Sequence, residues 1–144
     1  FLNSPFALPK ERAISGIFLP PKRKKRSPYT TFDILSNPNT PKVIINSQGQ
    51  AIYFSRSVIP YLRGQNENEW ASLRTYYKHI GIYAYRVEAL KRITKMPQTP
   101  LELAESLEQL RWIENNLIIQ TAVTNIETIG IDTPEDLERI NEII

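Results

Sequence analysis

Cysteine is absent from this sequence of 144 residues, and histidine occurs once, at His79. Without cysteine there are no disulfide bonds and no thiolate chemistry. One imidazole and no thiolate also argue against a closed zinc site, so any metal ion would sit on carboxylates, which favours magnesium, manganese or calcium. The lack of cysteine suits a reducing compartment, and we expect a cytoplasmic protein.

Long apolar runs are missing as well. No run of about 18 apolar residues occurs, so we expect no membrane-spanning helix and no membrane partner. The sequence has neither a phosphate-binding glycine loop nor a Gly-x-Ser-x-Gly elbow, which leaves little support for a hydrolase. It starts at Phe1 rather than Met, and residues 1–20 lack the features of a signal peptide. We therefore expect a processed or truncated chain, or one taken from an incomplete reading frame.

The composition that remains is ordinary for one soluble globular domain, with 41% hydrophobic and 23% charged residues. The charge is unevenly distributed: residues 1–31 carry seven basic residues and one acid, whereas residues 32–144 carry 11 basic and 14 acidic residues. The front segment also contains five of the 11 prolines. We expect residues 1–31 to be a basic, proline-rich segment that is irregular and foreign to the fold, and residues 32–144 to form the folded domain.

The basic run Lys22–Arg26 has two interpretations. It is either a nucleic-acid-binding patch or a solvated charge run. No aromatic residues interleave with these charges to stack on bases, so we expect no nucleic-acid partner. Deleting residues 1–31 would separate the two: a salt-dependent affinity for nucleic acid that is lost on deletion would favour the binding patch.

From Phe32 onward, strand and helix patterns alternate, which indicates an α/β domain. Apolar segments separated by Ser47–Gln50 predict a hairpin of two strands, Lys42–Asn46 and Ala51–Ser55. A helix is expected over Pro100–Asn115, because Thr99, Pro100 and Glu102 form a capping-box pattern at its start. The remaining expected elements are a short helix over Val87–Lys95, a strand over Leu117–Val123 and a final helix that begins after Thr133.

The segment Tyr77–Arg86 predicts a strand with two unlike faces. One face carries Tyr77, His79, Gly81, Tyr83 and Tyr85, which are rings with polar tips around a glycine that lets a ligand approach the backbone. The other face has an aliphatic centre at Ile80 and Ile82 that could pack on helices. The segment is either one wall of a small-molecule pocket or an ordinary half-buried strand.

Three further groups carry polar side chains with two interpretations each. Glu105, Glu108 and Gln109, at three- and four-residue spacing on one helix, either bind sugar hydroxyls or form a solvated face. Arg56 either grips a carboxylate with two hydrogen bonds or forms a surface salt bridge. Asp132, between a strand-like segment and a helix start, either holds Mg²⁺ or helps to cap the helix.

Four segments together resemble one family in their order and spacing: Tyr53–Tyr61, Tyr77–Arg86, Pro100–Arg111 and Gly130–Glu138. The segment Asn37–Val43 fits the part that precedes them. From about Thr31 to Ile144, the chain is similar to 3-deoxy-manno-octulosonate cytidylyltransferases, also called CMP-Kdo synthetases, where Kdo is the octulosonate sugar acid. Four ordered motifs make this a far more specific signal than one short pattern.

The resemblance implies an α/β fold: part of a nucleotide-diphospho-sugar-transferase-like mixed sheet flanked by helices. It implies an enzyme that forms CMP-Kdo and pyrophosphate from CTP and Kdo, with Mg²⁺, for lipopolysaccharide synthesis, in a homodimer. Arg56 would bind the Kdo carboxylate, and Asp132 would be one of two aspartates that hold the metal. The other Kdo-binding residues would be His79, Tyr83, Glu105, Glu108 and Gln109. A related cytidylyltransferase for another acidic sugar, such as a sialic acid, is the alternative.

The sequence also departs from the family pattern. The nucleotide-binding half, with its basic loop for the triphosphate and its Asp-Glu-Pro motif, is absent. Val58 stands where the family pattern Ser-Arg-Ser-Pro-Ile-Pro has its first proline. We therefore expect these 144 residues alone to lack CTP binding and turnover.

Overall fold

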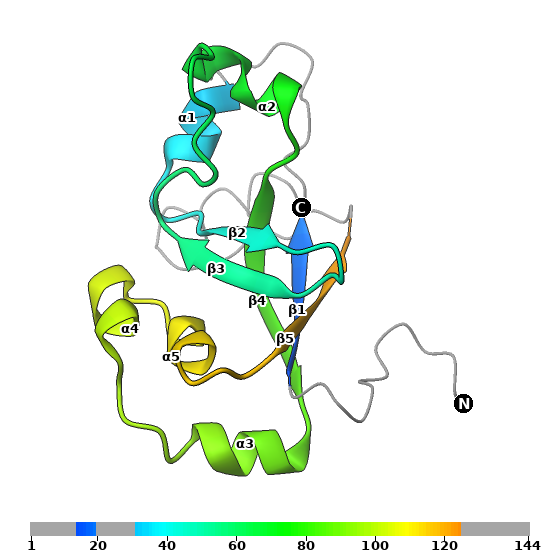
Figure 1. Cartoon of the computed structure of the whole chain (residues 1–144), viewed down its shortest axis with the longest axis vertical. Coiled ribbons are helices and arrows are strands. Elements are labelled where there is room, and N and C mark those ends of the chain that lie inside the picture. Colours follow the sequence, from blue (N-terminus) through cyan, green and yellow to red (C-terminus); the bar gives the residue numbers. More distant parts are fainter. Residues whose placement is uncertain (1–13, 20–30, 125–144) are drawn as a thin grey trace, which may run out of the picture.

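The computed structural model describes residues 14–19, by their backbone alone, and residues 31–124 (Figure 1). Side chains are described for residues 32–124. In chain order, the elements are β1 (Ile14–Leu19), α1 (Thr31–Ser36), β2 (Lys42–Ile45), β3 (Ala51–Ser55), η1 (Glu67–Glu69), α2 (Trp70–Leu73), β4 (Tyr77–Tyr85), α3 (Val87–Ile93), α4 (Pro100–Glu105), α5 (Gln109–Glu114) and β5 (Ile119–Val123).

The described strands form one sheet in the order β3-β2-β4-β1-β5. Strands β1 and β5 are parallel, and the other neighbours are antiparallel. Helices α1 and α2 lie at one end of β4 and α3 lies at the other end, while α4 and α5 lie beside the β2–β3 hairpin (Figure 1). The expected α/β fold with a mixed sheet flanked by helices is therefore confirmed.

Strand β1 lies within the front segment, which we expected to be irregular. Ile14 pairs with Tyr85 of β4 on one side and with Ile119 of β5 on the other, so β1 occupies an interior position in the sheet. The expectation of irregular structure is wrong for residues 14–19, because six residues without proline are enough for a strand, and the proline count of the whole segment obscured them. Lys22–Arg26 lie outside the described residues.

The expected β2–β3 hairpin is confirmed, with Lys42 opposite Ser55 and Val43 opposite Phe54. Its turn is built by Asn46, whose Oδ1 accepts hydrogen bonds from the backbone N–H groups of Gln48 and Gln50, each at 2.9 Å. Gly49 has a φ of 72°, which favours glycine. The turn also reaches β5, since the Gly49 carbonyl accepts from Gln120 Nε2 at 2.7 Å.

The prediction of a single helix over Pro100–Asn115 is wrong. The helix is interrupted at Ser106, which has a left-handed φ of 51°, and continues as α5 only from Gln109. The physical reason is packing. Leu107 and Leu110 are both buried in the main core, whereas Leu103, on the α4 side of the break, is 61% exposed. The break at Ser106 turns Leu107 toward the core, so α4 and α5 do not share one continuous apolar face.

Two apolar clusters hold the described part together. The larger one joins the sheet to α5 through Val43, Phe54, Ile93, Leu107, Leu110, Trp112, Leu117 and Ile119. The smaller one lies between α1 and α2 and contains Leu35, Trp70 and Tyr76. The larger cluster underlies the side of β4 that carries the tyrosine rings, since Tyr77 and Tyr83 pack against it.

Candidate functional site

The candidate site is centred on an irregularity in β4. Opposite β1, Gly16 pairs with Tyr83 and Phe18 pairs with His79, so two steps along β1 correspond to four along β4. The extra residues form a bulge at Gly81, whose φ is 82°. In an unbroken strand, residues four apart are about 13 Å apart along the chain. The bulge instead places Tyr83 Oη 2.8 Å from His79 Nε2, with ring centroids 5.4 Å apart.

Burial keeps this pair uncharged at neutral pH. It lowers the pKa of His79 from 6.5 to about 4, because the imidazolium form loses hydration. Burial also raises the pKa of Tyr83, and the neighbouring Tyr85 and Glu108 add to the rise. The pair therefore offers neutral hydrogen-bonding groups, and which of the two atoms donates depends on the histidine tautomer.

The two faces of β4 are used differently from what we expected. The face with His79 and Tyr83 packs toward Phe54 and Trp112, with ring centroids 5.3 Å apart for Phe54 and His79 and 5.0 Å apart for Tyr83 and Trp112. The expectation that the aliphatic face packs on helices is wrong for Ile82, which is 50% exposed. The bulge at Gly81 interrupts the simple alternation on which that expectation depended.

Helix α5, whose Trp112 ring contacts Tyr83, carries two unsatisfied donors. Gln109 is 5% exposed and Trp112 is 2% exposed, yet neither Gln109 Nε2 nor Trp112 Nε1 has a hydrogen-bond partner. The two residues are three positions apart on one helix and so share a face. Buried donors without partners are rare, which marks this face as a place where an acceptor from a ligand or water can bind.

The sequence predicted Gln109 but missed Trp112 as a site residue. Trp112 lies within the expected helix, and its ring is buried in the main core. Its ring stands edge-on to Tyr83 and to Tyr85, with centroids 5.0 Å and 5.8 Å apart. An unpaired indole N–H leaves no trace in a hydrophobic pattern, so only the structure could find it.

Glu105 and Arg56 are brought together, and each already has partners within the chain. The Glu105 carboxylate accepts from Ser55 Oγ at 2.6 Å and from the Arg56 backbone N–H at 2.9 Å. The Arg56 side chain donates to the carbonyl oxygens of Pro38, Glu105 and Ser106, at 2.9, 2.7 and 3.3 Å. A guanidinium has five N–H groups, so donors remain for a ligand carboxylate.

Lys42 contacts the backbone of Arg56, and the sequence did not predict it as a site residue. It is 1% exposed, and its Nζ donates to the carbonyl oxygens of Asn37 at 3.1 Å and Arg56 at 2.5 Å. Burial lowers the pKa of Lys42 from 10.5 to about 8, although Glu105 opposes that shift. Lys42 thereby fixes the backbone from which Arg56 projects.

Glu108 and Asp132 complete the predicted set. The Glu108 side chain is 63% exposed, and its Oε1 lies 3.6 Å from Arg111 Nη2. Asp132 lies outside the described residues. Within residues 31–124, no group of three or more histidine, cysteine, aspartate or glutamate side chains is placed to hold a metal ion. The magnesium site therefore stays a prediction that rests on one carboxylate.

The fold and the family comparison agree on the class of protein. The sequence model of the cytidylyltransferase family matches residues 23–142. The match covers most of the chain, so the chain belongs to the cytidylyltransferase family.

Curated relatives of the chain indicate which kind of cytidylyltransferase it resembles. The chain is 61% identical over 105 residues to the 3-deoxy-manno-octulosonate cytidylyltransferase of Parabacteroides distasonis, a match that covers 73% of this chain and 42% of the relative. It is 47% identical over 149 residues to the protein of the same name from Bacteroides thetaiotaomicron, with 99% of this chain and 60% of the relative covered. A match of 99% takes in most of residues 1–31, so the similarity reaches further than the expected Thr31–Ile144.

A solved structure supports the same assignment. The chain resembles the structure of CMP:2-keto-3-deoxy-manno-octonic acid synthetase complexed with CTP, with a TM-score of 0.75 and 33% sequence identity. The likeness covers 92% of this chain and 48% of that chain. The chain thus spans about half the length of the relatives that it matches. In its described part, none of the helices has the length and apolar character needed to cross a membrane.

Proposed function

We propose that this chain supplies the sugar-acid-binding part of an enzyme that forms CMP-Kdo and pyrophosphate from CTP and Kdo. The observation that carries the proposal is the group of neutral polar side chains on β4 and α5: the His79–Tyr83 pair and the unpartnered Gln109 Nε2. The relatives named 3-deoxy-manno-octulosonate cytidylyltransferase supply the substrate class.

The chemistry of the reaction explains why such a site is useful. The anomeric hydroxyl of Kdo must attack the α-phosphate of CTP, which brings two anions together. Neutral donors and acceptors can bind the sugar hydroxyls without adding charge to the part of the site that β4 and α5 form. Magnesium, when bound, would neutralise phosphate charge. We propose Asp132 as one of its ligands, because hard cations prefer carboxylate oxygen.

The predicted residues have distinct proposed roles. His79, Tyr83 and Gln109 bind sugar hydroxyls from the buried side, and the exposed Glu108 binds them from the open side. Arg56 binds the Kdo carboxylate with the N–H groups that Pro38, Glu105 and Ser106 leave free. Glu105 binds a hydroxyl through the lone pairs that its bonds to Ser55 and Arg56 leave available.

The setting of this activity is also part of the proposal. We propose that the whole enzyme acts in the cytoplasm as a homodimer and that its product serves lipopolysaccharide synthesis. CTP and Kdo are its proposed small-molecule partners.

Calorimetric titration of the chain with Kdo tests the proposal. We expect binding of Kdo, weaker binding of N-acetylneuraminate and no binding of glucose, which lacks a carboxylate. Gln109→Leu should weaken Kdo binding by about tenfold, the value of one hydrogen bond in affinity. Lys91→Ala, which removes an exposed ion pair with Glu88, serves as the control. Equal binding of all three sugars, or none of Kdo, would overturn the assignment.

An assay of CMP-Kdo formation tests whether these 144 residues can catalyse the reaction without the rest of the enzyme. We expect no CMP-Kdo from the 144 residues with CTP, Kdo and magnesium, because they span only 42–60% of the relatives quoted above. Adding a nucleotide-binding half from such a relative should restore product. Clear turnover by the 144 residues alone would contradict the division of the site that we propose.

A further inference from the structure

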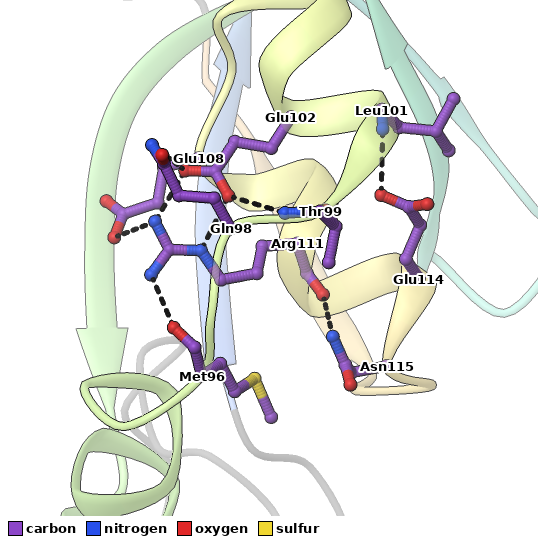
Figure 2. A network of polar contacts seen from close by, with 9 residues as sticks. All are labelled: Met96, Gln98, Thr99, Leu101, Glu102, Glu108, Arg111, Glu114 and Asn115. Atoms are coloured by element: carbon purple, nitrogen blue, oxygen red, sulfur yellow. Dashed lines mark hydrogen bonds and ion pairs between the residues drawn. The ribbon is translucent and has the colours of Figure 1, made fainter.

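Helices α4 and α5 form a corner that side chains tie together (Figure 2). Arg111 of α5 makes a bidentate ion pair with Glu102 of α4, with 2.7 Å between Nε and Oε2 and 2.5 Å between Nη2 and Oε1. Glu114 of α5 accepts a hydrogen bond from the backbone N–H of Leu101 at 3.1 Å. The first turn of α4 is therefore fastened to α5 at two points.

The ion pair is shielded and well supplied with partners. Only 14% of the Arg111 side chain and 7% of the Glu102 side chain are exposed. Arg111 Nη1 donates to the Met96 carbonyl at 3.3 Å, and Glu102 accepts from the Thr99 backbone N–H at 3.3 Å. The hydrogen bonds from Arg111 lower the pKa of Glu102 and so keep the pair charged. A buried pair of this kind adds little net stability but is costly to break, so it fixes geometry.

Two residues of the candidate site lie next to the Arg111–Glu102 ion pair. Glu108 Oε1 lies 3.6 Å from Arg111 Nη2, and Gln109 is the next residue and the first of α5. The left-handed Ser106 separates Glu105 from both of them. Helical geometry therefore does not set the spacing between Glu105 and Gln109, and the ties between α4 and α5 must do so.

We propose that Arg111 is a positioning residue for the sugar-acid site. By holding α5 against Glu102 and by facing the Glu108 carboxylate, Arg111 sets the direction in which Gln109 presents its Nε2 donors. The inference rests on the proposed function for its ligand, but the orientation of Gln109 needs no ligand to be observed.

The test compares Arg111→Lys and Glu102→Gln with the control Lys91→Ala on the 144-residue chain. Arg111→Lys keeps the charge but loses the planar fork that binds both carboxylate oxygens. The first readout is the NMR signal of the Gln109 side-chain amide without ligand, assigned by its loss in Gln109→Glu. The second is the affinity for Kdo, measured below the melting temperature of each variant.

We expect both test variants to shift the Gln109 amide signal toward the random-coil value and to weaken Kdo binding by about tenfold. The control should change neither. An unchanged amide signal and unchanged affinity in variants that only melt earlier would show that Arg111 is merely a structural tie and overturn the proposal. If the wild-type chain does not bind Kdo, the proposed function fails, and the amide signal still decides the role of Arg111.

Discussion

Tyr83 Oη lies 2.8 Å from His79 Nε2, although the two residues are four positions apart on a β-strand. The contact exists because β4 bulges at Gly81. A polar pair in the middle of a strand thereby lies on the same side as α5, next to the ring of Trp112. The geometry of the site thus depends on one backbone conformation that glycine adopts readily.

Gly81→Ala should disrupt this arrangement. A φ of 82° is strained for alanine, so we expect a loss of about 1–2 kcal/mol in the free energy of unfolding. The bulge should also relax and separate His79 from Tyr83, which weakens Kdo binding in a calorimetric titration. Gly64→Ala is the matched control, because Gly64 has a φ of 77° and open space around its Cα. Equal losses of affinity in both variants would contradict the role of the bulge.

Trp112→Phe should separate stability from binding. The variant keeps a ring against Tyr83 but removes the unpartnered indole N–H and part of a buried ring, so we expect a modest loss of stability and a several-fold loss of Kdo affinity. Trp70→Phe is the contrasting variant, because Trp70 Nε1 donates to the Gln65 carbonyl at 3.2 Å, away from the site. It should unfold more easily and keep its affinity. Unchanged affinity in Trp112→Phe would exclude the indole N–H from the site.

Acid should destabilise the chain through His79. The folded pKa of about 4 lies below the unfolded value of 6.5, so the unfolded chain binds more protons between these limits. The contribution of His79 is fully present above pH 6.5 and falls by roughly 3 kcal/mol as the pH approaches 4. Urea unfolding at pH 7, 5.5 and 4 measures the effect. His79→Gln should show a shallower decline, and an identical decline in both proteins would contradict the assignment.

Lys42 should act at the opposite end of the pH scale. Its folded pKa of about 8 lies below the ordinary 10.5, so the unfolded chain binds more protons between these values. The contribution of Lys42 to the free energy of unfolding therefore rises with pH in that window. Lys42→Met should remove this rise when unfolding is compared at pH 7.5 and 9.5. Lys91→Met, at an exposed position, is the control. A slope that persists in Lys42→Met would contradict the prediction.

Much of the fold could be predicted because local patterns determine it. The β2–β3 hairpin follows from two apolar segments and a turn that Asn46 and Gly49 can build. The break at Ser106 could not be predicted, because the sequence on both sides favours helix and only the burial of Leu107 explains the interruption. Strand β1 was missed because its six residues stand among prolines and basic residues.

The site was predictable by residue type more than by geometry. The family resemblance selected His79, Tyr83 and Gln109, which the structure brings to adjoining parts of β4 and α5. It gave no indication of the partners of Arg56 within the chain, since hydrogen bonds to carbonyl oxygens such as that of Pro38 depend on long-range packing. The burial of Lys42 also depends on long-range packing. The sequence did not indicate it, because a lysine at the start of a strand is usually exposed.

The interior position of β1 changes how the front segment can be studied. Deleting residues 1–31 would remove a strand that separates β4 from β5, so β5 would lose its long parallel partner. A loss of nucleic-acid affinity in such a truncated chain would report damage to the sheet as readily as the loss of a basic patch. Replacing the charges of Lys22–Arg26 with glutamine, while the strand is left intact, tests the patch without cutting through the middle of the protein.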